Sequence, residues 1–161
     1  MSRKEAYFNT VFKNSICDMQ DNQYSAYKIS DIGAEGTIAK PFDGFGVYQN
    51  QPLYWEGKRT NELKAFNIKH LFEGERGHQM NWMSTFSCIP DSHVWIVLFA
   101  AIPRKNRMYV FDYGLIKKLY ESGETSIKKK VLEKLPFSPI KKDRFDHIYE
   151  IDYNVYVEVL P

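Results

Sequence analysis

An unbroken apolar run from Val94 to Ile102 is the feature that most constrains this chain. The run is shorter than the roughly 18 to 20 residues that span a bilayer, and its length suits a β-strand. Because its side chains are apolar on both faces, we expect His93–Ile102 to be a central strand in a sheet that is covered on both sides. A chain of 161 residues is expected to form one domain, residues 1–161, around such a sheet.

Apolar spacing and turn residues predict the elements around that strand. The stripe that supports a helix over residues 3–16 consists of Tyr7, Phe8, Val11 and Phe12. Further helices are expected over about 73–86, 113–122 and 126–135, strands over 24–29, 45–48, 52–56, 65–68, 108–112 and 153–160, and a loop over 136–142. This order is not a regular βαβ alternation. The predicted fold class is therefore mixed α/β (α+β), with a central mixed β-sheet flanked by helices.

A β-hairpin is expected where Gln49-Asn50-Gln51 separates two strand-like runs, 45–48 and 52–56. A turn at Gln49-Asn50 pairs residues whose numbers sum to about 99, which places Asp43 opposite Glu56. Cross-strand neighbours lie roughly 4.5 to 5.5 Å apart at Cβ. Because side chains alternate along a strand, Lys58 lies on the same face as Glu56. The hairpin therefore gathers three charged groups at one end.

An acidic residue that faces a Glu-x-Lys triplet has a chemical rationale. Two neighbouring carboxylates repel unless a divalent cation lies between them, and hard oxygen ligands favour Mg²⁺ or Mn²⁺. Such a cation polarises a phosphodiester and lowers the pKa of a bound water. Lys58 can then orient that water or neutralise charge on the phosphate. The alternative is that these residues are surface charges at the end of a hairpin, as we expect for the second triplet, Glu62-Leu63-Lys64.

Four short segments between residues 38 and 112 carry a more specific pattern. They are Lys40-Pro41-Phe42-Asp43-Gly44, Tyr54-Trp55-Glu56-Gly57-Lys58-Arg59-Thr60, Phe66-Asn67-Ile68, and Gly77-His78-Gln79 before an apolar strand. Together they resemble the PD-(D/E)xK nuclease superfamily, and within it the RecU-type Holliday-junction resolvases. The resemblance implies a restriction-endonuclease-like core. The span before Asp43 lacks the long stalk-like insertion of the RecU-type proteins.

The resemblance also implies a role for each matching residue. Asp43 and Glu56 are the implied ligands of Mg²⁺ or Mn²⁺, with the Gly57 carbonyl as a third. Lys58 is the implied catalytic lysine, and Gln79 lies near the site. Glu5 is the candidate for a further carboxylate from the first helix; the alternative is an exposed first-turn glutamate favoured by the helix dipole.

Charge is nearly balanced, with 22 basic and 20 acidic side chains and a net charge of +2, so the total does not indicate a nucleic-acid partner. The distribution is more informative because the basic groups cluster. The candidate DNA-binding residues are Arg59, Lys64, Lys69, His78, Arg104, Lys105 and Arg107. Such charge runs are also typical of a solvated face. The tryptophans, Trp55, Trp82 and Trp95, are expected in the core.

These features predict a Mg²⁺- or Mn²⁺-dependent endodeoxyribonuclease that resolves four-way DNA junctions in recombination or repair. Two symmetric cuts need two active sites, so a homodimer is expected. One alternative is a nuclease of the same fold that acts on DNA ends, on flaps or as a restriction enzyme does. Another is a non-enzymatic module that binds nucleic acid or protein. Two cysteines, Cys17 and Cys88, and the lack of an apolar signal core favour the cytoplasm of a bacterial or phage-infected cell, with no membrane partner.

Overall fold

A computed structural model describes residues 3–17, 24–29, 41–60, 62–73, 77–101, 106–135 and 138–139. The helices are α1 (Arg3–Cys17), α2 (Lys69–Phe72), α3 (Gly77–Phe86), α4 (Tyr113–Glu121) and α5 (Lys129–Leu132). The strands are β1 (Ser25–Lys28), β2 (Gly44–Tyr48), β3 (Gln51–Thr60), β4 (Phe66–Asn67), β5 (His93–Ala100), β6 (Arg107–Asp112), β7 (Ser126–Ile127) and β8 (Ser138–Pro139). The chain has the mixed α/β class that the sequence predicts.

Six strands form the main sheet in the order β1-β2-β3-β5-β6-β8. Among the described strands, β3 and β5 pair in parallel and the other neighbours pair antiparallel, so the sheet is mixed. All eight residues of β5 are buried, which confirms the prediction of a central strand. Strands β4 and β7 form a separate two-stranded sheet.

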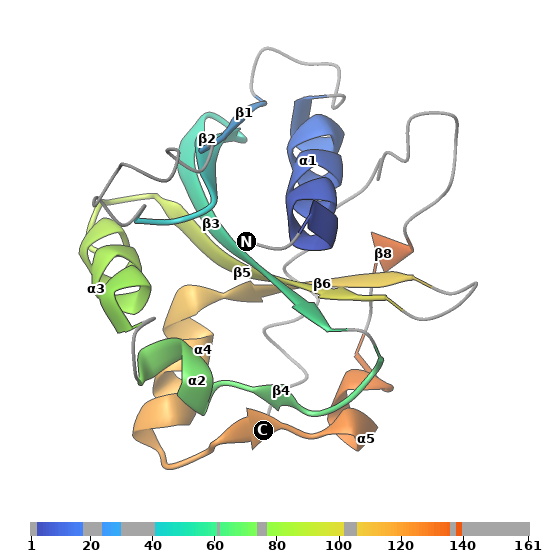
Figure 1. The fold of residues 1–161 in the computed structure, drawn as a ribbon. Coiled ribbons are helices and arrows are strands. Elements are labelled where there is room, and N and C mark those ends of the chain that lie inside the picture. The colour runs from blue at the N-terminus through green and yellow to red at the C-terminus, as the bar shows by residue number, and fades with distance from the viewer. Residues whose placement is uncertain are drawn as a thin grey trace, which may run out of the picture.

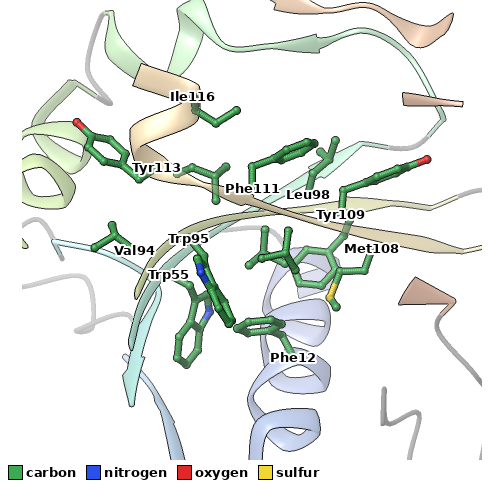
Figure 2. Packing of buried hydrophobic residues seen from close by; sticks show 14 of the residues in the cluster. Phe12, Trp55, Val94, Trp95, Leu98, Met108, Tyr109, Phe111, Tyr113 and Ile116 are labelled. Atoms are coloured by element: carbon green, nitrogen blue, oxygen red, sulfur yellow. The ribbon is translucent and has the colours of Figure 1, made fainter. Parts of the chain in front are cut away.

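Helices cover both faces of the main sheet (Figure 1). On the α1 face, the Phe12 ring contacts the Trp55 ring edge-on at 5.1 Å, and Phe8 stacks on Phe99 at 5.0 Å. Because side chains alternate along β5 and β6, Leu98 and Phe111 point to the opposite face, where α4 lies (Figure 2). The core therefore has two layers, one on each side of the central strands.

The structure corrects one expectation about the core. Trp55 and Trp95 are fully buried, as predicted, but Trp82 is 47% exposed. Helix α3 buries Gln79, Met80 and Met83. A residue two positions after Met80 lies about 200° around the helix axis, which turns Trp82 toward solvent.

Several predicted boundaries also need correction. The helix expected over 73–86 is α3, which begins at Gly77, and the separate short α2 precedes it. The helix expected over 126–135 is divided, because Ile127 pairs with Phe66 in the β4–β7 sheet and α5 begins only at Lys129. Strand β8 lies within the loop predicted over 136–142 and pairs with β6. The strand expected over 153–160 lies outside the described residues.

Within the described part of the chain, no helix is both long and apolar enough to cross a membrane. Cys17 and Cys88 are exposed free thiols.

Candidate metal-binding and catalytic site

The β2–β3 hairpin has the predicted register. Its paired residues, from Gly44 with Trp55 to Tyr48 with Gln51, have numbers that sum to 99. The two turn residues, Gln49 and Asn50, both have positive φ angles, 52° and 62°, which are typical of the type I′ turn that suits the twist of a hairpin. The paired residues end at Gly44 with Trp55, so the expected pairing of Asp43 with Glu56 lies outside this register.

Asp43 lies immediately before β2, and its backbone N–H and carbonyl both form hydrogen bonds to neighbouring segments. Its N–H donates to the Trp55 carbonyl at 3.0 Å, and its carbonyl accepts from the Ile29 N–H at 2.8 Å. The residue is only 3% exposed. Its Oδ2 accepts hydrogen bonds from the Gly57 N–H at 3.0 Å and from Asn9 Nδ2 at 2.8 Å. These four contacts fix the Asp43 carboxylate beside the middle of β3.

Gly57 is the point where Asp43 meets the Glu-x-Lys triplet. In a strand, the N–H and C=O of one residue point to the same side, so the Gly57 carbonyl faces the side from which Asp43 approaches. A Cβ at Gly57 would lie 2.2 Å from Asn9 Oδ1. Glycine is needed here because the Asn9 amide occupies the space that a side chain would fill.

Glu56, Lys58 and Gln79 form a buried polar cluster on the sheet face that α3 covers. Their exposed fractions are 2%, 8% and 9%. Lys58 Nζ forms an ion pair with Glu56 Oε1 and donates to Gln79 Oε1 at 3.3 Å. Removing two charges from water costs several kcal/mol, which close pairing and further hydrogen bonds must offset. A buried ion pair of this kind is an expensive feature that marks a candidate functional site.

A hollow of about 280 Å³ is lined by Lys58 of this cluster. Its polar lining includes Thr60 from β3, Asn67 from β4 and His70 from α2. The hollow places the buried ammonium group within reach of a small polar or charged ligand.

The predicted residues form two separate sets of contacts on β3, one toward α1 and one toward α3. Asp43 joins Gly57, and Glu56 joins Lys58 and Gln79. No group of three or more His, Cys, Asp and Glu side chains that could hold a metal ion occurs among the described residues. The oxygen donors expected for a cation are the Asp43 and Glu56 carboxylates and the Gly57 carbonyl, and the two carboxylates contact different partners, Asn9 of α1 and Lys58. These hard oxygen donors match the preference of Mg²⁺ and Mn²⁺.

The candidate DNA-binding residues are more dispersed. Lys64 and Lys69 are exposed and form ion pairs with Glu62 at 3.4 Å and Glu73 at 3.6 Å. His78 is exposed at the start of α3, next to Gln79.

Two arginines of that set lie elsewhere. The Arg59 guanidinium lies 5.9 Å from the centre of the Phe8 ring, on the α1 face. Arg107 Nη1 donates to Tyr109 Oη at 3.4 Å. Arg104 and Lys105 fall in a part of the chain that the structure does not describe, as does the side chain of Glu5.

Asn9 is the site residue that sequence reasoning missed. It is fully buried, and it is the residue of α1 that contacts Asp43. The sequence position of Asn9 could have indicated this role, since Asn9 directly follows Phe8 of the apolar stripe. A polar side chain beside the core-facing stripe of a helix requires a hydrogen-bond partner.

Comparison with models of known protein families finds no match, and comparison with curated proteins finds no relative. The chemistry of the site is therefore inferred from its own residues.

Proposed function

We propose that this protein is a divalent-metal-dependent endodeoxyribonuclease of the PD-(D/E)xK type. One observation carries the proposal. The buried Lys58 of β3 contacts Glu56 of the same strand and Gln79 of α3. The backbone N–H of Gly57, which lies between Glu56 and Lys58, binds Asp43. Two carboxylates, a strand carbonyl and an ammonium group, contributed by three consecutive residues of β3 and by Asp43 bound to the middle one, support phosphodiester hydrolysis.

The oxygen donors of Asp43, Glu56 and Gly57 would hold Mg²⁺ or Mn²⁺. A bound divalent cation supplies Lewis-acid chemistry at a phosphodiester. Asn9 and Gly57 orient the Asp43 carboxylate for this role.

Lys58 acts on the phosphate. In the absence of substrate its ammonium group is held by Glu56 and Gln79. A phosphodiester that enters the adjacent hollow brings negative charge to Lys58, and the ammonium group stabilises the additional charge that develops in the transition state. Gln79 keeps Lys58 in position, because its amide oxygen accepts a hydrogen bond from Nζ.

The proposed substrate is branched DNA, with four-way junctions as the leading candidate and a homodimer as the working form. Exposed basic residues support a DNA partner on the site's face of the sheet. Lys64, Lys69 and His78 lie on or beside β4, α2 and α3, which cover the face that carries Glu56 and Lys58 (Figure 1). These side chains could contact phosphates on either side of the cleaved bond.

The deciding experiment compares cleavage of a four-way junction, a flap and a linear duplex, each with Mg²⁺ and with EDTA. We expect Mg²⁺-dependent, symmetric nicks across the junction and none in EDTA. Preferred cleavage of the flap or of linear DNA would support the nuclease proposal but would contradict the proposal that the protein is a junction resolvase. The Asp43→Asn variant is the matched control, and full cleavage by this variant would reject the site.

Calorimetry with Mn²⁺ separates the enzyme from a non-enzymatic module. The intact protein should bind Mn²⁺, and Asp43→Asn should bind it much more weakly. Absence of binding at millimolar Mn²⁺ would favour a module that binds nucleic acid or protein without cutting it.

A further inference from the structure

Two exposed aromatic rings lie side by side next to the candidate site. Tyr27 on β1 and Phe45 on β2 are cross-strand partners, and their ring centroids are 5.7 Å apart with planes inclined by 25°. Tyr27 is 62% exposed and Phe45 is 43% exposed. We refer to this stacked pair as the aromatic ledge. Its rings present an apolar, flat surface to solvent.

The ledge is continuous with the candidate site. Phe45 follows Asp43 by two residues and pairs across the hairpin with Tyr54. Because side chains alternate along β3, Tyr54 and Glu56 share a face, and Phe45 lies on that face as well. Phe45 and Glu56 are diagonal neighbours, a relationship that corresponds to a separation of roughly 7 to 8 Å. A DNA strand that is cut beside Glu56 can therefore extend over the ledge.

Two lysines lie at the same edge of the sheet, on the α1 side of β1. A hollow of about 390 Å³ runs along β1 and is lined by Lys13, Cys17, Ser25, Ala26, Tyr27 and Lys28. None of these lining residues is acidic. The lysines of the hollow therefore favour a negatively charged ligand. The ledge lies on the opposite face of β1, so a DNA strand that passes over this edge of the sheet leads from the ledge to the hollow.

We infer that the ledge and this hollow bind unpaired nucleotides of a DNA strand next to the bond that is cut. Bases stack on Tyr27 and Phe45, and phosphates lie near Lys13 and Lys28. Aromatic rings with adjacent cations are the features that bind single-stranded nucleic acid without sequence preference. The inference rests on the proposed nuclease function and specifies its substrate as DNA with unpaired bases beside the cleavage point. Paired bases in a duplex are stacked on one another and cannot use the ledge.

The test measures binding of a fluorescently labelled short oligothymidylate in EDTA, which prevents cleavage. We expect Tyr27→Leu and Phe45→Leu to weaken binding by about tenfold each, while binding of a linear duplex changes little. Trp82→Leu is the matched control, because Trp82 is an exposed aromatic residue on α3, and this variant should bind as the parent does. Thermal unfolding checks that each variant is folded. Tyr27→Leu decides the question if Phe45→Leu is unstable, because Tyr27 is the more exposed of the two rings.

Three outcomes would overturn the inference. One is unchanged oligothymidylate binding by both ledge variants, and another is an equal loss of duplex binding. The third is a change of oligomeric state in Tyr27→Leu with unchanged DNA binding, which would identify β1 as a contact between two copies of this chain.

Cleavage assays keep this inference separate from the proposed function. If the parent cuts no DNA but its oligothymidylate binding depends on Tyr27, the nuclease proposal fails and the ledge remains a binding site. If the parent cuts branched DNA and the ledge variants cut and bind normally, the nuclease proposal stands and the ledge inference fails.

Discussion

Asn9 in α1 donates a 2.8 Å hydrogen bond from its Nδ2 to Oδ2 of Asp43, a residue 34 positions further along the chain. Both residues are buried, with exposed fractions of 0% and 3%. The bond connects the first helix to the hairpin that carries Glu56 and Lys58. The candidate site is therefore complete only when α1 is packed on the sheet, and its geometry depends on tertiary folding.

Replacing Asn9 tests that connection. Asn9→Ala removes a buried donor and leaves Asp43 with one fewer partner, so the free energy of unfolding should fall by about 1 to 3 kcal/mol. Cleavage should fall as well, because the Asp43 carboxylate loses a group that orients it. Urea unfolding and single-turnover cleavage measure the two effects.

Asn14→Ala is the matched control for this variant, since Asn14 is a half-buried asparagine on the same helix. It should retain parent-like cleavage. If Asn9→Ala also cuts DNA at the parent rate, Asn9 has no role in positioning Asp43.

Gly57 provides a second test of the same arrangement. A methyl group at this position would approach Asn9 Oδ1 to 2.2 Å, so Gly57→Ala should displace the Asn9 side chain and weaken its bond to Asp43. The cost should be smaller in a chain that already carries Asn9→Ala, because the obstructing amide is then absent. A double-mutant cycle of unfolding free energies should show a coupling of about 0.5 to 3 kcal/mol. Strict additivity would mean that the alanine is accommodated without moving Asn9.

The part of the site that sequence predicts is the part built by local structure. The turn at Gln49-Asn50 determines the hairpin register, which brings the start of β2 beside Trp55, the residue before the Glu-x-Lys triplet. Asn9 could not be placed in this way, because its contact with Asp43 depends on how α1 packs. The same limit applies to Ile127, whose apolar spacing suits a helix until it pairs with Phe66 from a distant part of the chain. Periodicity reports which face is buried but does not identify the partner.

Lys58 should be essential for cleavage and dispensable for DNA binding. Lys58→Met retains an unbranched, apolar side chain but removes the ammonium group, so single-turnover cleavage should fall by about 10²- to 10³-fold. Binding to a four-way junction in Ca²⁺ should change little, because Lys58 is only 8% exposed. The variant also leaves Glu56 without its cationic partner, and this should lower stability.

Lys117→Met is the control for the loss of a lysine charge outside the site, because Lys117 is not among the candidate DNA-binding residues and its ion pair with Glu121 is a surface contact. This variant should cut at close to the parent rate. Parent-like cleavage by Lys58→Met would remove Lys58 from the catalytic site.

The hairpin turn offers a stabilising substitution. Asn50 has a φ of 62°, in the region that glycine adopts without steric cost, and glycine is strongly preferred at this position of a type I′ turn. Asn50→Gly should therefore raise the free energy of unfolding by a few tenths of a kcal/mol to about 1 kcal/mol. Asn50→Val, with a branched side chain at the same φ, should lower it. Equal stability of the two variants in urea would contradict the turn geometry.

His93 should make the stability of the protein depend on pH. Burial lowers the pKa of His93 below its ordinary value of 6.5, and the negative charge of Asp112 partly opposes that shift. Below pH 6.5 the unfolded chain binds a proton at His93 that the folded chain does not bind. The stability that neutral His93 gives the folded protein is therefore fully present above pH 6.5 and is lost as the pH falls toward the folded-state pKa. His93→Phe retains a ring against Tyr48 and Trp95 but cannot titrate, so its unfolding free energy should fall less than that of the parent between about pH 7.5 and pH 5. Asp112→Asn retains a residue that can cap α4 and should make the pH dependence steeper. An unaltered pH dependence in His93→Phe would show that other groups determine the acid sensitivity of the fold.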